Sequence, residues 1–111
     1  MSWTIKYYSS KIQEEILLLP PGIKARYIYC TQLMLDFGPN LKEPHTKALG
    51  NGLFELRLKS REGIARVLYC TVAGRSIIML HVFIKKSKKT PRRELEIAIQ
   101  RMKEIKQHAD S

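Results

Sequence analysis

The sequence predicts an α+β fold: one small domain, residues 1–111, in which an antiparallel sheet packs on a helical hairpin. Residues 53–84 contain three apolar runs separated by two short turns, which is typical of consecutive antiparallel strands. Residues 10–37 carry two apolar patterns of helical period, split by a pair of prolines. With a short strand at residues 3–8 and a third helical pattern after the sheet, the expected order is βααβββα.

The three apolar runs of the sheet have different patterns. Residues 64–72 are rich in β-branched and aromatic side chains, as a returning strand should be. Residues 77–84 are almost continuously apolar, so both faces need cover, and we expect this strand to be the central and most buried one. Residues 53–59 instead alternate, with Phe54, Leu56 and Leu58 on one face and Glu55, Arg57 and Lys59 on the other.

The helical hairpin is bounded by capping residues. Ser10 is the expected N-cap of the first helix, and Pro21 is suited to open the second. Gly38 and the proline after it should end the second helix, and residues 40–52 should form a connecting loop. The second helix carries an apolar seam with spacings of four and three: Ile23, Tyr27, Cys30, Met34 and Phe37.

The last helix follows a basic segment. Thr90 is its expected N-cap, with Pro91 at the first helical position, and the helical pattern continues to about Gln107. The apolar face of this helix consists of Leu95, Ile99 and Met102.

Composition excludes several classes of protein. No apolar run approaches the roughly 20 residues of a membrane-spanning helix. The first ten residues lack the apolar core of a signal peptide, so we expect a cytoplasmic protein. Cys30 and Cys70 lie within apolar patterns and should be buried, reduced thiols. The three histidines are scattered and no CxxC pair occurs, so the sequence predicts neither a metal site nor a cofactor.

Charge is the most informative property of the composition. Twenty Lys and Arg residues oppose ten Asp and Glu residues, which gives a formal net charge of +10. Six of the nine residues from 85 to 93 are basic. On a domain of this size, such clustering favours a polyanionic partner such as nucleic acid or the ribosome.

Four cations near the sheet are the candidate catalytic residues. Arg57 lies on the charged face of its strand, Arg66 interrupts an apolar strand, and Lys85 and Lys86 stand where the last strand ends. A buried arginine needs a partner, so Arg66 either pairs structurally with a nearby glutamate or grips a phosphate with its planar fork of donors. His81 and Tyr69 are interpreted as core residues.

Within residues 47–102, the pieces LFELR, ARVLY, LHVFIKK and KTPRRELEIAIQR occur in sequence. In their order and spacing they resemble the bacterial RelE/ParE toxin superfamily, and within it the HigB-like branch of host-killing toxins, many of them described as phage-derived proteins. The strand and two helices at the N-terminus extend the resemblance over nearly the whole chain. The resemblance implies a small RelE-like toxin domain.

For the RelE- and HigB-like members, the resemblance implies cleavage of mRNA on the ribosome without a metal. The ribose 2′-OH attacks the adjacent phosphate, and basic side chains activate it and stabilise the charge. Arg66 matches the family's arginine in the ARVLY strand, and Lys86 falls where relatives have a basic residue after the last strand. RelE carries a tyrosine in its final helix, where this chain has Leu95, so the general base is unassigned.

The resemblance also implies partners: a cognate antitoxin with a HigA-like helix-turn-helix domain, the ribosome and mRNA, and operator DNA only through the antitoxin. No membrane is expected among the partners. Two alternatives remain, a ParE-like inhibitor of DNA gyrase without enzymatic activity and a non-toxic basic relative that binds nucleic acid. Residues expected to hold RNA are Lys47, Lys88, Lys89, Arg92 and Arg93.

Overall fold

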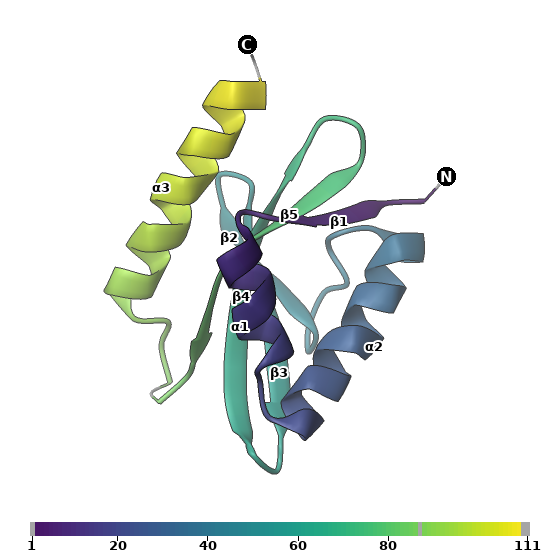
Figure 1. Cartoon of the computed structure of the whole chain (residues 1–111), viewed down its shortest axis with the longest axis vertical. Helices are drawn as coiled ribbons and strands as arrows, with labels where there is room; N and C mark the ends of the chain where they lie inside the picture. The colour runs from purple at the N-terminus through teal and green to yellow at the C-terminus, as the bar shows by residue number, and fades with distance from the viewer. Residues whose placement is uncertain (1, 87, 110–111) are drawn as a thin grey trace.

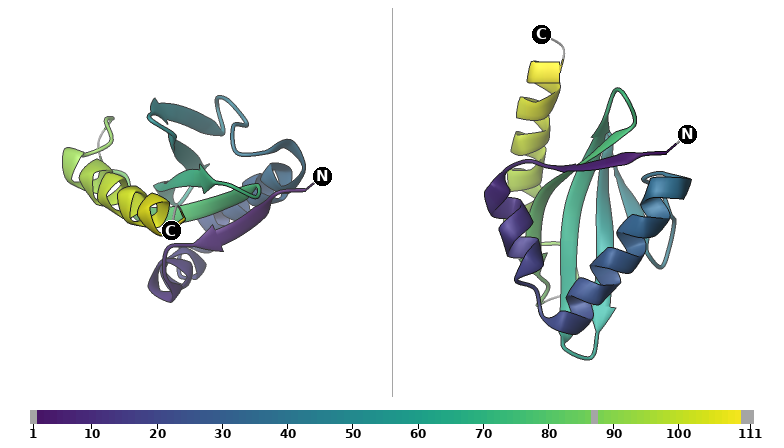
Figure 2. Two further views of the ribbon diagram at one scale, coloured as in Figure 1. Left: turned by 90° about the horizontal axis from the view of Figure 1, so that it is seen from above. Right: turned by 45° about the vertical axis from the view of Figure 1, so that its right-hand side comes forward.

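The computed structural model describes residues 2–86 and 88–109. Helices α1 (Ser10–Leu17) and α2 (Pro21–Phe37) lie on one face of a five-stranded sheet, and α3 (Arg92–Ala109) lies on the other (Figures 1 and 2). This arrangement confirms the predicted α+β class. The strands are β1 (Thr4–Tyr7), β2 (Thr46–Gly50), β3 (Leu53–Ser60), β4 (Gly63–Val72) and β5 (Ser76–Ile84).

The sheet has the order β1-β5-β4-β3-β2 and differs in two ways from the predicted one. β1 pairs with β5 in parallel, so the sheet is mixed rather than antiparallel. β2 lies within residues 40–52, where the sequence predicts only a loop, and it pairs antiparallel with β3. Ala, Lys and Gly are depleted in strands, so the sequence TKALG gives little local signal. It becomes a strand because the free edge of β3 offers backbone partners.

The middle strand is β4, whereas the sequence predicts residues 77–84 for that position. β5 is interior as well, between β1 and β4. Its continuous apolar sequence reflects helices on both sides, since α1 packs on one face of β5 and α3 on the other. A run of apolar residues therefore indicates that both faces of a strand are covered by helices. β5 meets this condition although β4 is the central strand.

Hydrogen exchange should be slowest in β4. Its residues 65–70 are all buried, and β3 and β5 hydrogen-bond it on both sides. β1 is an edge strand whose side chains are half-buried or exposed, so its amides should exchange faster. Native-state exchange followed by mass spectrometry or NMR checks this order, and slower exchange in β1 than in β4 would contradict it.

The helix ends predicted from capping residues agree with the structure to within one residue for α1 and α2. Ser9, not Ser10, caps α1, and its hydroxyl accepts a hydrogen bond from the amide of Ile12 at 3.3 Å. Pro21 opens α2 and Gly38 ends it, as predicted. The apolar seam of α2 is buried except for Phe37, which is 74% exposed because it lies in the last turn, beyond the sheet.

The sheet separates two apolar cores. The core on the α1–α2 face contains Leu56, Val67, Tyr69 and Met79 from the strands. The core on the α3 face is smaller, with Leu53, Leu68, Cys70, Ile78 and Leu80 beneath Ala98 and Met102. Toward the β3–β4 turn, the α3 face carries charged side chains instead of apolar ones, and the candidate site lies there.

Candidate functional site

Strand register brings the candidate cations to one face of the sheet. Lys47 on β2 lies opposite Glu55 on β3, and Arg57 lies opposite Arg66 on β4. The amide of Lys85 still donates to the carbonyl of Ile64 at 2.7 Å, so the strand pairing extends one residue past β5. Lys47, Arg57, Arg66 and Lys85, arranged around Glu55, are called here the cationic cluster.

Glu55 is the buried anion of the cationic cluster, with only 2% of its surface exposed. Its Oε1 lies 3.3 Å from the Nε atoms of both Arg57 and Arg66. The hydroxyl of Thr90 donates to its other oxygen, Oε2. One carboxylate thus holds two arginines and the segment that leads into α3. The Thr90 hydroxyl therefore binds Glu55 instead of capping α3 as the sequence predicted. The helix itself begins at Arg92.

Arg66 is buried, and its contact with Glu55 supports the structural ion pair considered from sequence. The pair is incomplete in geometry, because Arg66 Nε, although 3.3 Å from the carboxylate oxygen, makes no hydrogen bond to any described residue. A buried donor without a partner is costly unless a ligand satisfies it. The two interpretations of Arg66 are therefore compatible: Glu55 positions the side chain without saturating it.

A pocket of about 320 Å³ opens beside the two arginines. Arg57 forms one wall and is also paired with the exposed Glu43, 3.1 Å away. Arg26 of α2 reaches this pocket, although it is an exposed residue off the apolar seam and gives no sequence signal for a site. The lining is mostly basic: Arg26, Pro44, His45, Arg57, Lys59, Ile64 and Arg66.

The environment of the cationic cluster shifts two pKa values. Burial lowers the pKa of Arg66; Glu55 opposes this and Arg57 adds to it. Burial is also the first cause that lowers the pKa of Lys85, followed by the charge of Arg66, with Arg57 and Lys47 adding smaller effects. A lysine with a lowered pKa can release its proton more readily at neutral pH, whereas an arginine stays charged.

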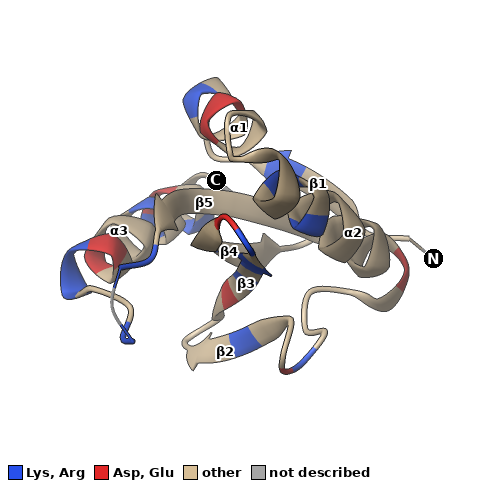
Figure 3. Cartoon of the chain, turned by 90° about the horizontal axis from the view of Figure 1, so that it is seen from below, with Lys and Arg blue, Asp and Glu red and all other residues tan. Residues whose placement is uncertain are grey.

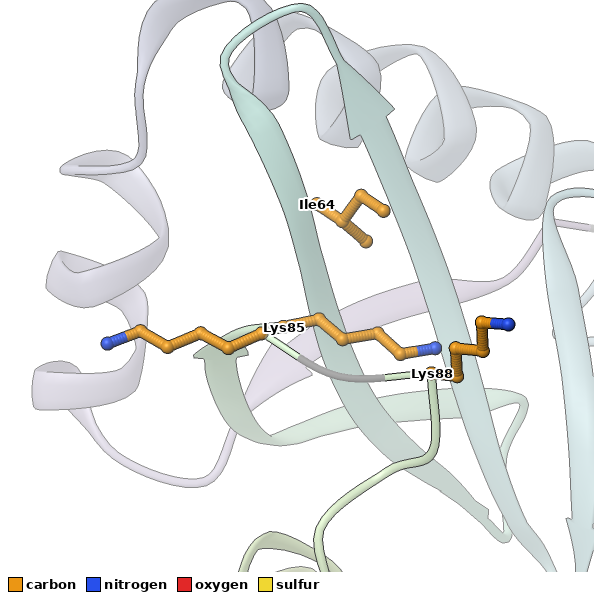
Figure 4. A pocket seen from close by; sticks show the side chains of 4 residues that line it. Ile64, Lys85 and Lys88 are labelled. Carbon is orange, nitrogen blue, oxygen red and sulfur yellow. The ribbon is translucent and has the colours of Figure 1, made fainter.

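Lys85 and Lys86 have different surroundings. Lys85 interacts electrostatically with Arg66, Arg57 and Glu55. Lys86 lies beyond the end of β5 and is exposed, whereas Lys85 is half-buried. Both line a shallow hollow of about 430 Å³ with Ile64 and Lys88 (Figure 4).

The other predicted RNA-binding residues lie at different places relative to the cationic cluster. Basic positions appear on β2, on the β3–β4 turn and on the segment that leads into α3 (Figure 3). Lys88 and Lys89 are exposed in that segment. Arg92 pairs with Glu96 at 3.4 Å on the surface of α3. Arg93 lines a different pocket with Tyr8 and Glu104, so the structure does not bring it to Arg66.

The residues interpreted as core side chains have partners. His81 is half-buried between β5 and α3, with its Nε2 atom 3.2 Å from Glu94 and its ring stacked on Phe83. Tyr69 is fully buried, and its hydroxyl donates to the carbonyl of Pro39. Cys30 and Cys70 are buried free thiols, as predicted, and burial raises the pKa of each. Because these side chains are buried or have partners, the cationic cluster is the region best suited to bind a ligand.

Neither a metal site nor a membrane-spanning helix is found in the part of the chain that the structure describes. Within residues 2–86 and 88–109, no group of three His, Cys, Asp or Glu side chains could hold a metal ion. None of the described helices is long and apolar enough to cross a membrane.

Comparison with known proteins places the chain in a family. No curated protein matches it. A family model described as "Phage derived protein Gp49-like (DUF891)" matches residues 14–103, which include the whole cationic cluster. This match covers most of the chain, from α1 to α3. The chain therefore belongs to the Gp49-like family of phage-derived proteins, a RelE/ParE-like family of toxins in toxin–antitoxin systems.

Proposed function

We propose that this toxin is a ribosome-dependent mRNA endoribonuclease of the HigB-like branch, neutralised by a cognate antitoxin. One observation carries the proposal: Arg57, Arg66 and Lys85 converge on the buried Glu55 beside a basic pocket. Cleavage of a phosphate ester needs fixed positive donors where negative charge develops. This cluster supplies such donors without a metal.

In the proposed reaction, the ribose 2′-oxygen attacks the adjacent phosphorus and the bond to the 5′-oxygen breaks. The products are a 2′,3′-cyclic phosphate and a 5′-hydroxyl, so the reaction consumes no water. Arg66 grips two phosphate oxygens, because its planar fork of donors matches that geometry. Neutral Lys85 accepts the 2′-OH proton, and a protonated neighbour or water returns one to the leaving oxygen.

The remaining cations of the proposed site bind RNA or assist. Arg57 supports the charge of the transition state from the pocket wall. Lys47, Lys88, Lys89, Arg92 and Arg93 hold RNA or the ribosome through salt-dependent contacts. The catalytic role predicted for Lys86 stays a hypothesis. Lys85 is the lysine whose charge interacts with that of Arg66. A substrate translated on ribosomes would place the protein in the cytoplasm.

The deciding experiment induces the protein in cells and maps mRNA 5′ ends, with ribosome engagement allowed or blocked. Cuts inside translated frames that disappear when initiation is blocked are the expected result. Cuts in naked RNA would reject the need for a ribosome. DNA damage without mRNA cuts would instead select gyrase as the target, and any operator binding should require the antitoxin.

The pH dependence of cleavage tests the role of Lys85. Only the neutral amine accepts a proton, so the rate should rise with pH and level off above the Lys85 pKa, which lies below the usual lysine value of 10.5. Lys85→Arg stays protonated, so its rate should be lower and nearly independent of pH. Single-turnover cleavage on programmed ribosomes measures this, with Lys11→Arg on the exposed surface of α1 as the control. A wild-type pH profile in Lys85→Arg would exclude Lys85 as the base.

A further inference from the structure

A second cavity lies on the same face of the sheet as the cationic cluster. It occupies about 270 Å³ between the β2–β3 turn and α3. This is slightly smaller than the roughly 300–1,000 Å³ of typical small-molecule sites, so it suits one or two side chains. Its lining is mainly apolar, with a lysine at the rim: Leu49, Gly50, Asn51, Leu53, Leu95, Ile99, Met102 and Lys103.

The rim of this apolar pocket is positive. Lys103 is exposed at the rim on α3. One turn further along α3, the ammonium of Lys106 lies against the β2–β3 turn, 3.0 Å from the position that a β-carbon on Gly52 would occupy. No acidic residue lines the pocket within the described part of the chain. An apolar floor with a lysine rim favours an apolar side chain flanked by carboxylates.

The apolar pocket continues into the cationic cluster along β2 and β3. Lys47 lies directly opposite Glu55, so these two residues share a face of the sheet. The pairing shifts between Ala48 and Gly50, and Leu49, at this irregularity, packs against the apolar core that contains Leu53. Leu53 and Glu55 are two residues apart on β3 and therefore share that face. A chain seated in the pocket can thus extend along β2 to Lys47 and reach Arg57 and Arg66. The arrangement provides an apolar anchor at one end and a line of positive charge leading from it.

We propose that the apolar pocket docks an acidic peptide segment of a protein partner, which inserts one large apolar side chain and lays its carboxylates over the cationic cluster. This inference rests on the antitoxin of the proposed function and names the surface that it covers. A second copy of this chain is disfavoured as the occupant, because each carries a net charge of +10. Nucleic acid would leave the apolar floor unfilled.

Binding of a synthetic peptide to the full-length protein tests the proposal. The probe is a fluorescent peptide of glutamates around a single phenylalanine, compared with the same peptide carrying alanine there. Burial of the aromatic ring predicts roughly tenfold or tighter binding of the phenylalanine peptide by anisotropy. Ile99→Phe fills the pocket and should remove that preference. Lys103→Glu should weaken binding several-fold, while the matched reversal Lys11→Glu on α1 should change it less than about twofold.

Other outcomes would overturn the docking site. Equal binding of the two peptides would show attraction by charge alone. NMR shift changes confined to the exposed apolar residues of α2, such as Ile28 and Leu35, would place the anchor on the opposite layer. A thermal melt confirms that Ile99→Phe is folded, and Lys103→Glu tests the rim independently. If the protein cuts no mRNA but prefers the phenylalanine peptide, only the nuclease proposal fails; cutting without that preference rejects only the docking site.

Discussion

Replacing Arg66 with alanine is expected to lower the rate of mRNA cleavage by about a hundredfold or more. The reason is geometric: Arg66 is held by Glu55 within the cationic cluster, and its Nε makes no hydrogen bond to a described residue. Arg66→Lys keeps the charge but loses the fork, so it should recover only a small part of the rate. Primer extension on programmed ribosomes measures the rate.

Controls for Arg66 separate chemistry from folding. Glu55 keeps Arg57 and Thr90 as partners when Arg66 is absent, so Arg66→Ala should remain folded. Co-sedimentation should show that it still binds ribosomes. Arg61→Ala, in the exposed β3–β4 turn, removes a matching charge and should cut normally. Unfolding of Arg66→Ala would favour the structural ion pair, and a folded Arg66→Ala that cuts at the wild-type rate would remove Arg66 from the site.

Replacing Glu55 with alanine is expected to lower the free energy of unfolding by roughly 3–5 kcal/mol, the usual cost of breaking a buried ion pair. The carboxylate is buried, neutralises two arginines and anchors Thr90. Without it, positive charges face one another across β3 and β4. Urea denaturation measures the loss, and added phosphate or sulfate should restore part of it by occupying the vacated anion position.

Glu43 provides the matched control for Glu55. It pairs with the same arginine, Arg57, at 3.1 Å, but its side chain is 67% exposed. Exposed pairs contribute about 0–1 kcal/mol, so Glu43→Ala should be close to neutral. Equal losses for the two variants would show that Glu55 does not organise the cluster. Glu55→Gln should fall between them, since its amide oxygen can still accept from Thr90.

The sequence by itself determined the local elements of this protein. The two-residue alternation of β3 placed Leu56 and Leu58 in the core and put Glu55 and Arg57 on the opposite face. The proline and glycine at the ends of α2 act through backbone geometry that the chain has before it folds. Signals of this kind lie within a few residues of their effects, so they can be found without knowing which segments meet.

Only the tertiary structure decided which segments pair. The parallel pairing of β1, the strand at Thr46–Gly50 and the central place of β4 depend on partners distant in sequence. Short segments such as TKALG have weak intrinsic preferences, and the available edge determines their conformation.

The same limit applies to the site. The sequence singled out Arg57, Arg66, Lys85 and Lys86 because charges beside apolar runs are conspicuous. It could not show that Glu55 binds both arginines, that Arg26 reaches the pocket from the other layer, or that Lys85 rather than Lys86 interacts with Arg66. These facts depend on strand register and on which way each side chain points after pairing. They are fixed only when distant strands hydrogen-bond, because a shift of one residue would move every side chain to the opposite face.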